Sequence, residues 1–230
     1  MPEPAKSAGA HPMRLVLIPA VITLAVTLLR LIGELQGWSP RWFSTQTGGM
    51  IPSGVSWIVG ITWLAIPFGA YFALQLVHAG QGPQSIGKAL LLAAAAILFL
   101  LVYRYILYLF PPVGFPRVLI FIWLCWAIAG GLQYFGWPSL FKVLLCYGFA
   151  ARIPVAIVMF FAMLGNWGTH YDYVGMPQQF SMDPVPRFLW LAFFPQLVAW
   201  VSFTIAVGTF AGILAALIVR PKPERSFPIR

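Results

Sequence analysis

The chain of 230 residues is 60% hydrophobic and only 8% charged, with a mean hydropathy of +0.86. Soluble domains carry about 25% charged residues, so this composition excludes a soluble domain with an ordinary water-facing surface. The formal net charge is +9, but the basic residues lie mostly in the tails and at the ends of apolar segments. That placement is typical of topology signals beside anionic lipid headgroups. We therefore expect a protein that contacts membrane lipids and binds no nucleic acid.

Six apolar segments follow one another along the chain, and about 20 apolar residues cross the hydrocarbon core as a helix. They predict an all-α integral membrane protein with one domain of six transmembrane helices over residues 14–219. A polar cytoplasmic tail is expected at 1–13 and a basic, disordered cytoplasmic tail at 220–230. The predicted spans are residues 15–35, 55–77, 88–110, 117–135, 142–165 and 187–219.

The first span has the length of a signal-peptide core, but no small-residue cleavage site follows it, so we expect it to be retained. Its polar residues Thr23, Thr27, Arg30 and Glu34 recur at steps of four, three and four. This spacing places them on one helix face, which should point into the protein and away from lipid.

Lysine and arginine are distributed unevenly between the two ends of the predicted spans. One side holds Lys6, Arg14, Lys88, Lys142, Arg220, Lys222, Arg225 and Arg230, and the other holds Arg41, Arg117 and Arg187. The positive-inside rule then predicts cytoplasmic termini and two long outer loops, at 35–54 and 166–186. We expect a multi-pass protein of the cell membrane, which would be the inner membrane in a Gram-negative bacterium.

Four of the six spans contain an interior proline: Pro19, Pro67, Pro154 and Pro195. Proline removes a helix hydrogen bond, so several spans should be kinked. Transporters use such interrupted helices at sites in the middle of the membrane, although membrane helices are in general richer in proline than soluble ones.

Arg152 is the strongest candidate for a functional residue, because it lies near the middle of the fifth span. A guanidinium does not lose its proton, so at that depth it needs polar partners, and the sequence has no Asp or Glu at a comparable depth. Gln196, backbone carbonyls, aromatic rings or an external anion could serve. The alternative is a structural arginine bonded to carbonyls that Pro154 leaves free.

Arg30 and Arg104 should lie near the outer interface, where long side chains can reach the headgroups. Glu34 follows Arg30 by one helical turn and can pair with it. Three arginines near one carboxylate leave a positive excess that would suit an anionic ligand. We therefore predict a ligand site formed by Arg152, Arg30, Arg104, Gln196 and Glu34.

His170 and Asp172, two residues apart in the second outer loop, could contribute contacts or a proton relay there. No second histidine or cysteine in the outer loops completes a metal site, and Cys125 and Cys146 lie in apolar segments, so we expect no metal and no cofactor. Residues 82–89 imitate a phosphate-binding loop but lack the Ser/Thr after the lysine and the preceding strand. No catalytic set is complete, which argues against an enzyme.

Gly208, Gly212 and Ala216 recur every four residues in the last span and would let another helix pack closely. Three functions stay open. The first is binding or transport of a small anionic or amphipathic compound. The second is a non-catalytic subunit of a larger complex, docked to a membrane-protein partner through that small-residue row. The third is a lipid-modifying enzyme that uses His170 and Asp172.

Overall fold

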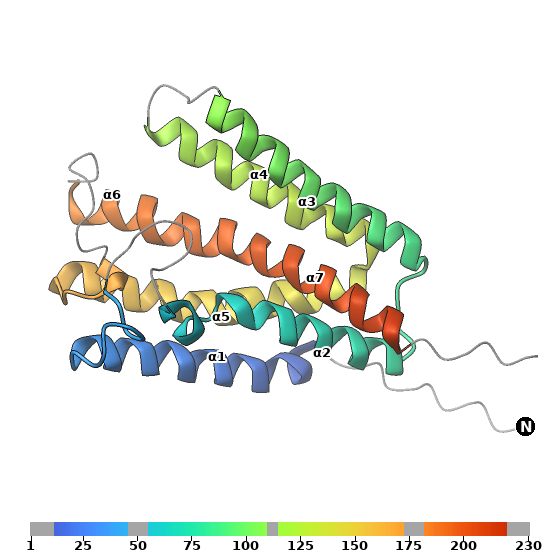
Figure 1. Cartoon of the computed structure of the whole chain (residues 1–230), viewed down its shortest axis with the longest axis horizontal. Helices are drawn as coiled ribbons and strands as arrows, with labels where there is room; N and C mark the ends of the chain where they lie inside the picture. Colours follow the sequence, from blue (N-terminus) through green and yellow to red (C-terminus); the bar gives the residue numbers. More distant parts are fainter. Residues whose placement is uncertain (1–11, 46–54, 110–114, 173–181, 220–230) are drawn as a thin grey trace, which may run out of the picture.

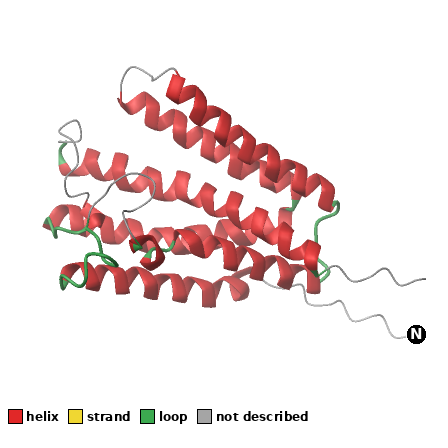
Figure 2. Cartoon of the chain, viewed as in Figure 1, coloured by secondary structure: helices red, strands yellow, loops and turns green. Residues whose placement is uncertain are grey.

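The structure is a computed structural model that describes residues 12–45, 55–109, 115–172 and 182–219. These residues form helices and loops without any strand (Figure 2). The two tails lie outside the described residues, except that Pro12 and Met13 belong to the first helix. The long helices are α1 (Pro12–Leu35), α3 (Ile86–Leu109), α4 (Phe115–Gly136), α5 (Pro138–Gly165) and α7 (Val201–Ile218).

Five helical segments of the described chain are long and apolar enough to cross a membrane, which supports a multi-pass membrane protein. The predicted span at 55–77, for which a kink is expected at Pro67, is not confirmed as one long helix. This segment contains two short 3-10 turns, η1 (Ser56–Val59) and η2 (Thr62–Leu64), followed by a 14-residue helix, α2 (Ala65–His78). Irregular backbone at membrane depth is tolerated where protein surrounds it, and Ser56 and Leu64 are both buried.

The last predicted span is a continuous helical path, but its centre is not α-helical. It begins with α6 (Pro184–Phe188), continues through two π-helical segments, η5 (Leu189–Phe193) and η6 (Pro195–Trp200), and ends in α7. Pro195 has no N–H to donate, so the regular hydrogen-bond ladder is interrupted at this position. In contrast, α1 and α5 remain α-helical through Pro19 and Pro154.

The helices form an elongated bundle with α5 and α7 at its centre (Figure 1). α1 packs against α5, α2 packs most extensively against α7, and the α3–α4 hairpin covers the other side of α7. The first residues of α1 and the last residues of α7 lie at the same end of the bundle. We call this end the terminal end, and the opposite end, where α1 and α5 finish, the loop end.

The row Gly208, Gly212 and Ala216 is buried within the chain. A methyl group added to Gly69 of α2 would lie 2.3 Å from the carbonyl oxygen of Gly208. A methyl group on Gly212 would lie 2.8 Å from the Cβ of Ala73. In this structure, α2 of the same chain therefore packs closely on the row of small residues that could otherwise contact a partner protein.

Two buried apolar clusters lie along the bundle. The cluster nearer the terminal end includes Phe72, Leu144 and Ile213, and the cluster nearer the loop end includes Met159 and Leu191. The predicted inward face of α1 is confirmed, because its four polar residues are at most 6% exposed: Thr23, Thr27, Arg30 and Glu34.

Candidate anion site

Arg152 lies in the middle of α5, fourteen residues after Pro138 and thirteen before Gly165. At 1.5 Å per residue this is about 20 Å from either end of a helix long enough to cross a membrane. Along α5 it lies between Ala151 of one apolar cluster and Val155 of the other, and the residue is 5% exposed. The sequence prediction of a buried guanidinium at mid-depth is therefore supported by the position of this residue.

The partners of Arg152 among the described residues are all uncharged. Its Nη1 donates a hydrogen bond of 3.3 Å to Oε1 of Gln196, and its guanidinium carbon lies 4.8 Å from the centre of the Trp200 ring. Its Nε is buried without a hydrogen-bond partner in the described part of the chain. Both ion pairs of this part are made by Glu34, so they leave Arg152 without a carboxylate.

The π-helical segment η6 brings Gln196 and Trp200 to this guanidinium. The two residues are four apart, so they face α5 together. The amide nitrogen of Gln196 in turn lies 3.4 Å from Sδ of Met159. A thioether sulfur accepts hydrogen bonds only weakly. π-helical segments occur frequently at functional sites, because they displace side chains from the regular helical register.

A second polar group, formed by Arg30, Glu34 and His170, lies at the loop end. Nε of Arg30 donates to Oε1 of Glu34 at 2.9 Å. The backbone N–H of His170 donates to Oε2 of the same carboxylate at 2.9 Å, and His170 Nδ1 lies 2.8 Å from Oε2. Glu34 is thus enclosed by three donors, and the predicted Arg30–Glu34 pair is joined by a histidine from the short 3-10 turn η3 (His170–Asp172).

Hydroxyl and carbonyl groups form a row of hydrogen bonds along α1, from Tyr171 of η3 to Tyr147 of α5. Tyr171 OH donates to the Thr27 carbonyl at 3.2 Å, and the Thr27 hydroxyl donates to the Thr23 carbonyl at 3.0 Å. The Thr23 hydroxyl lies 2.8 Å from the hydroxyl of Tyr147, which is five residues before Arg152 on α5. Burial raises the pKa of Tyr171 above its ordinary value, so this phenol keeps its proton.

Asp172 and Arg104 do not join the Arg152 contacts. Asp172 is buried in its own turn, where it accepts a 2.8 Å hydrogen bond from the backbone N–H of Gly168. Arg104 is exposed on α3, a helix that packs mainly against α4 and α7. Leu101, Tyr105 and Tyr108 surround it in a shallow surface pocket on one face of α3.

Sequence reasoning missed three members of the sites: Tyr147, Tyr171 and Trp200. Tyrosine and tryptophan are common at membrane interfaces, so nothing in the sequence distinguished these from the remaining aromatic residues. Tyr147 lies five residues before Arg152, a spacing that does not place the two side chains on one face of an α-helix. Trp200 required knowledge of how α5 and η6 pack.

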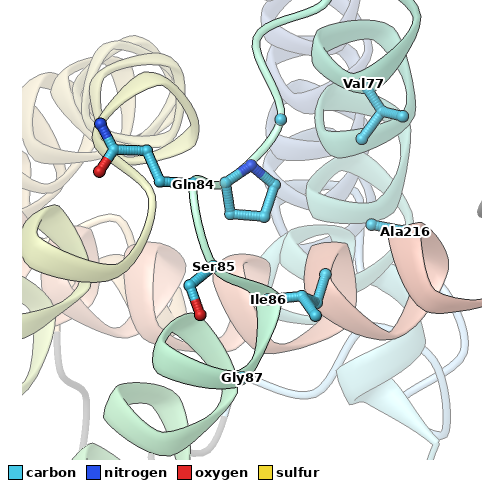
Figure 3. A pocket seen from close by; sticks show the side chains of 8 residues that line it. Val77, Gln84, Ser85, Ile86, Gly87 and Ala216 are labelled. Carbon is cyan, nitrogen blue, oxygen red and sulfur yellow. The ribbon is translucent and has the colours of Figure 1, made fainter.

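A pocket of about 400 Å³ lies at the terminal end, between the end of α2 and the start of α3 (Figure 3). Val77, Ile86 and Ala216 form apolar parts of its wall. It includes Gly82 and Gly87 of the segment that imitates a phosphate-binding loop. The hydroxyl of Ser85 accepts the backbone N–H of Lys88, so it is engaged as a helix cap.

No family model, no curated protein and no solved structure matches this chain. Within the described residues, no group of three or more His, Cys, Asp or Glu side chains could hold a metal ion. The chemistry of the site therefore has to be judged from its own residues.

Proposed function

We propose that this multi-pass membrane protein binds or transports a small anionic or amphipathic compound, and that Arg152 is the anchor for its negative group. The observation that carries the proposal is the incomplete pairing of a fully buried guanidinium. Arg152 has one long hydrogen bond to a neutral amide, one aromatic face and a free Nε among the described residues. An anion would supply the missing charge and acceptor.

The energetic argument is that a charged side chain at the centre of a membrane helix costs about 2.5–3.5 kcal/mol on insertion-based scales. The ion pair between Arg30 and Glu34 offsets this cost for Arg30. Arg152 has only an amide and a ring, which compensate a full charge poorly. Binding sites commonly contain a group of this kind, which lowers the stability of the folded protein until the ligand binds.

The surroundings of Arg152 favour a compound with an apolar part beside its charged group. Trp200 and Met159 lie within contact range of the Arg152–Gln196 pair, and both are apolar and polarisable. Arg30, at the loop end, is a second buried positive charge, which Glu34 pairs in the absence of a ligand. The same compound would meet the two arginines one after the other.

The two other functions have less support. A subunit role relied on the row of Gly208, Gly212 and Ala216, which α2 covers within this chain. An enzyme role relied on His170 and Asp172. These two side chains have separate partners: Nδ1 of His170 contacts Glu34, and Asp172 accepts from the backbone N–H of Gly168.

The test uses the purified protein in a mild nonionic detergent with 1-octanesulfonate as the probe, because this compound stays ionised at all relevant pH values. At a tenfold excess over its dissociation constant, the probe should stabilise the protein by about 1.4 kcal/mol, seen as a rise in unfolding temperature. 1-Octanol has the same chain without the charge and should give no such rise. Arg152→Gln should remove the stabilisation, and Arg117→Gln, which changes an exposed arginine, should retain it.

The proposal fails if Arg152→Gln and the unchanged protein are stabilised equally. It also fails if octanol is as effective as the sulfonate, because the charge would then play no part.

A further inference from the structure

The Arg30–Glu34–His170 group contains two titratable side chains that the anion site does not use. Glu34 and His170 come from α1 and η3, 136 residues apart in the sequence, and meet at 2.8 Å. The Glu34 side chain has no exposed surface, whereas the His170 side chain is 22% exposed. A buried carboxylate in contact with a partly accessible imidazole is an arrangement that can accept a proton from outside.

The hydrogen bonds determine which nitrogen of His170 is free. Glu34 accepts from Nε of Arg30 and from the backbone N–H of His170, so it is an ionised acceptor. Its contact with Nδ1 of His170 therefore requires that this nitrogen carries the hydrogen. Nε2 is left as the basic nitrogen, and a second proton would bind there without displacing any of the three donors to Glu34.

The charges that face His170 come from each element packed around it. α1 contributes Arg30 and Glu34, and η3 contributes Asp172. With a neutral imidazole, the formal charges of these three side chains sum to −1. A protonated imidazole adds +1 and brings the sum of the four groups to zero. An anion approaching Arg152 from the loop end is therefore repelled less after His170 takes up a proton.

Tyr171 joins this group to the anion site. Its ring centroid lies 3.9 Å from that of His170, and its hydroxyl bonds to Thr27 on the inner face of α1. It also lies within electrostatic range of both Arg152 and Glu34. A change of charge on His170 therefore occurs beside Tyr171, whose hydroxyl group reaches Thr27 on the inner face of α1.

We infer that Glu34 and His170 form a proton-binding site, and that a proton taken up there favours the binding of an anion at Arg152. This inference rests on the proposed anion-binding function and identifies the proton as the ion coupled to anion binding. By thermodynamic linkage, the anion must in turn favour uptake of the proton. A proton and a monovalent anion entering together add no net charge to the protein interior.

The experiment measures 1-octanesulfonate binding by isothermal titration calorimetry between pH 5.5 and pH 8. The unchanged protein should bind at least about fivefold more tightly at the acidic end, the lower bound of typical coupling between two sites. At pH 6.5, binding in two buffers of different ionisation enthalpy should reveal net proton uptake. His170→Gln should make the affinity independent of pH. His78→Gln, which changes an exposed histidine at the end of α2, should retain the pH dependence.

Each outcome is decisive. Binding that requires Arg152 but shows neither pH dependence nor proton uptake overturns the proton site and leaves the anion site intact. Retention of the pH dependence by His170→Gln overturns it as well. No binding of the sulfonate at any pH contradicts the anion site, and the coupling with it. If His170→Gln does not fold, proton uptake by the unchanged protein decides the question alone.

Discussion

Arg30 and Arg152 are both buried guanidinium groups, yet only Arg30 has a carboxylate partner among the described residues. Removal of the charge should therefore change the free energy of unfolding in opposite directions at the two arginines. Without Arg30, the buried carboxylate of Glu34 would lose its arginine and keep only the contacts with His170, whereas removal of Arg152 leaves behind only a neutral amide and a ring. Under the proposed function, Arg30 stabilises the fold and Arg152 is kept for a ligand, and this contrast distinguishes the two roles.

We expect Arg30→Met to lower the free energy of unfolding by about 3–5 kcal/mol, as for other buried pairs that lose one partner. Arg152→Met should leave it unchanged or raise it by about 1–3 kcal/mol, since the cost of the incompletely paired charge disappears. Equilibrium unfolding in mixed micelles without added ligand measures both. A loss of more than about 1 kcal/mol in Arg152→Met would assign this arginine a structural role instead.

His170 makes stability depend on pH. Burial is the main cause that holds the pKa of His170 below its ordinary value of 6.5, against the opposing effect of Glu34. The unfolded chain then binds a proton more readily than the folded protein. The contribution of neutral His170 is fully present above pH 6.5 and is lost as the pH falls from 6.5 towards the folded-state pKa.

Thermal unfolding at a series of pH values should accordingly show a fall in stability below pH 6.5 that is smaller in His170→Gln. The comparison must be made without an anionic ligand, because a ligand would favour the protonated form. A fall of equal size in both proteins would assign the titration to another group.

At the scale of the elements, the contact between α2 and α7 depends on the absence of side chains. A methyl group on Gly69 would meet the backbone of Gly208, which cannot move away as a flexible side chain could. We expect Gly69→Ala to lower the free energy of unfolding by about 1–3 kcal/mol through overpacking. Gly131→Ala in α4, with open space around the added methyl group, should be neutral or stabilise by up to about 1 kcal/mol.

Unfolding of the two variants in the same micelles tests this packing. Equal effects of Gly69→Ala and Gly131→Ala would mean that α2 and α7 do not approach each other as closely as described.

The sequence predicted the long helices and the inner face of α1, because apolar length and the spacing of polar residues are local properties. It failed at 55–77, where Gly60 and Pro67 indicated a kink but the chain forms two 3-10 turns before α2. It predicted that another helix could pack closely on the small residues of α7, but it did not show that this helix is α2 of the same chain. Apolar length does not reveal whether a segment packs as a full or a shortened helix, since that depends on its neighbours.

Only the local features of the candidate site could be predicted from the sequence. A charged residue inside an apolar segment, such as Arg152, is visible from the sequence alone. The meeting of Glu34 with His170 is a contact between distant parts of the chain, and one histidine in a loop gives no signal of it. The contact of Trp200 with Arg152 depends on the π-helical register of η6, which no sequence pattern indicated.

At the scale of the whole molecule, the distribution of basic residues and the common end of α1 and α7 lead to one prediction of topology. The loop that contains Gln84 should face the cytoplasm, and the start of α6 at Asp183 should face outwards. Both residues are exposed, so cysteines placed there are open to reagents.

In a background with Cys125 and Cys146 replaced by alanine, a membrane-impermeant maleimide should label Asp183→Cys in intact cells. It should label Gln84→Cys only after permeabilisation. Labelling of both from one side would contradict the arrangement of the spans, and the reverse pattern would contradict the orientation.

The central claim is that Arg152 is retained for an anionic ligand, and native mass spectrometry of the protein as purified from membranes tests it most directly. The account predicts an anionic compound bound to the unchanged protein and to Arg117→Gln, and lost from Arg152→Gln. Identical bound species in all three proteins, or only neutral ones, would contradict it.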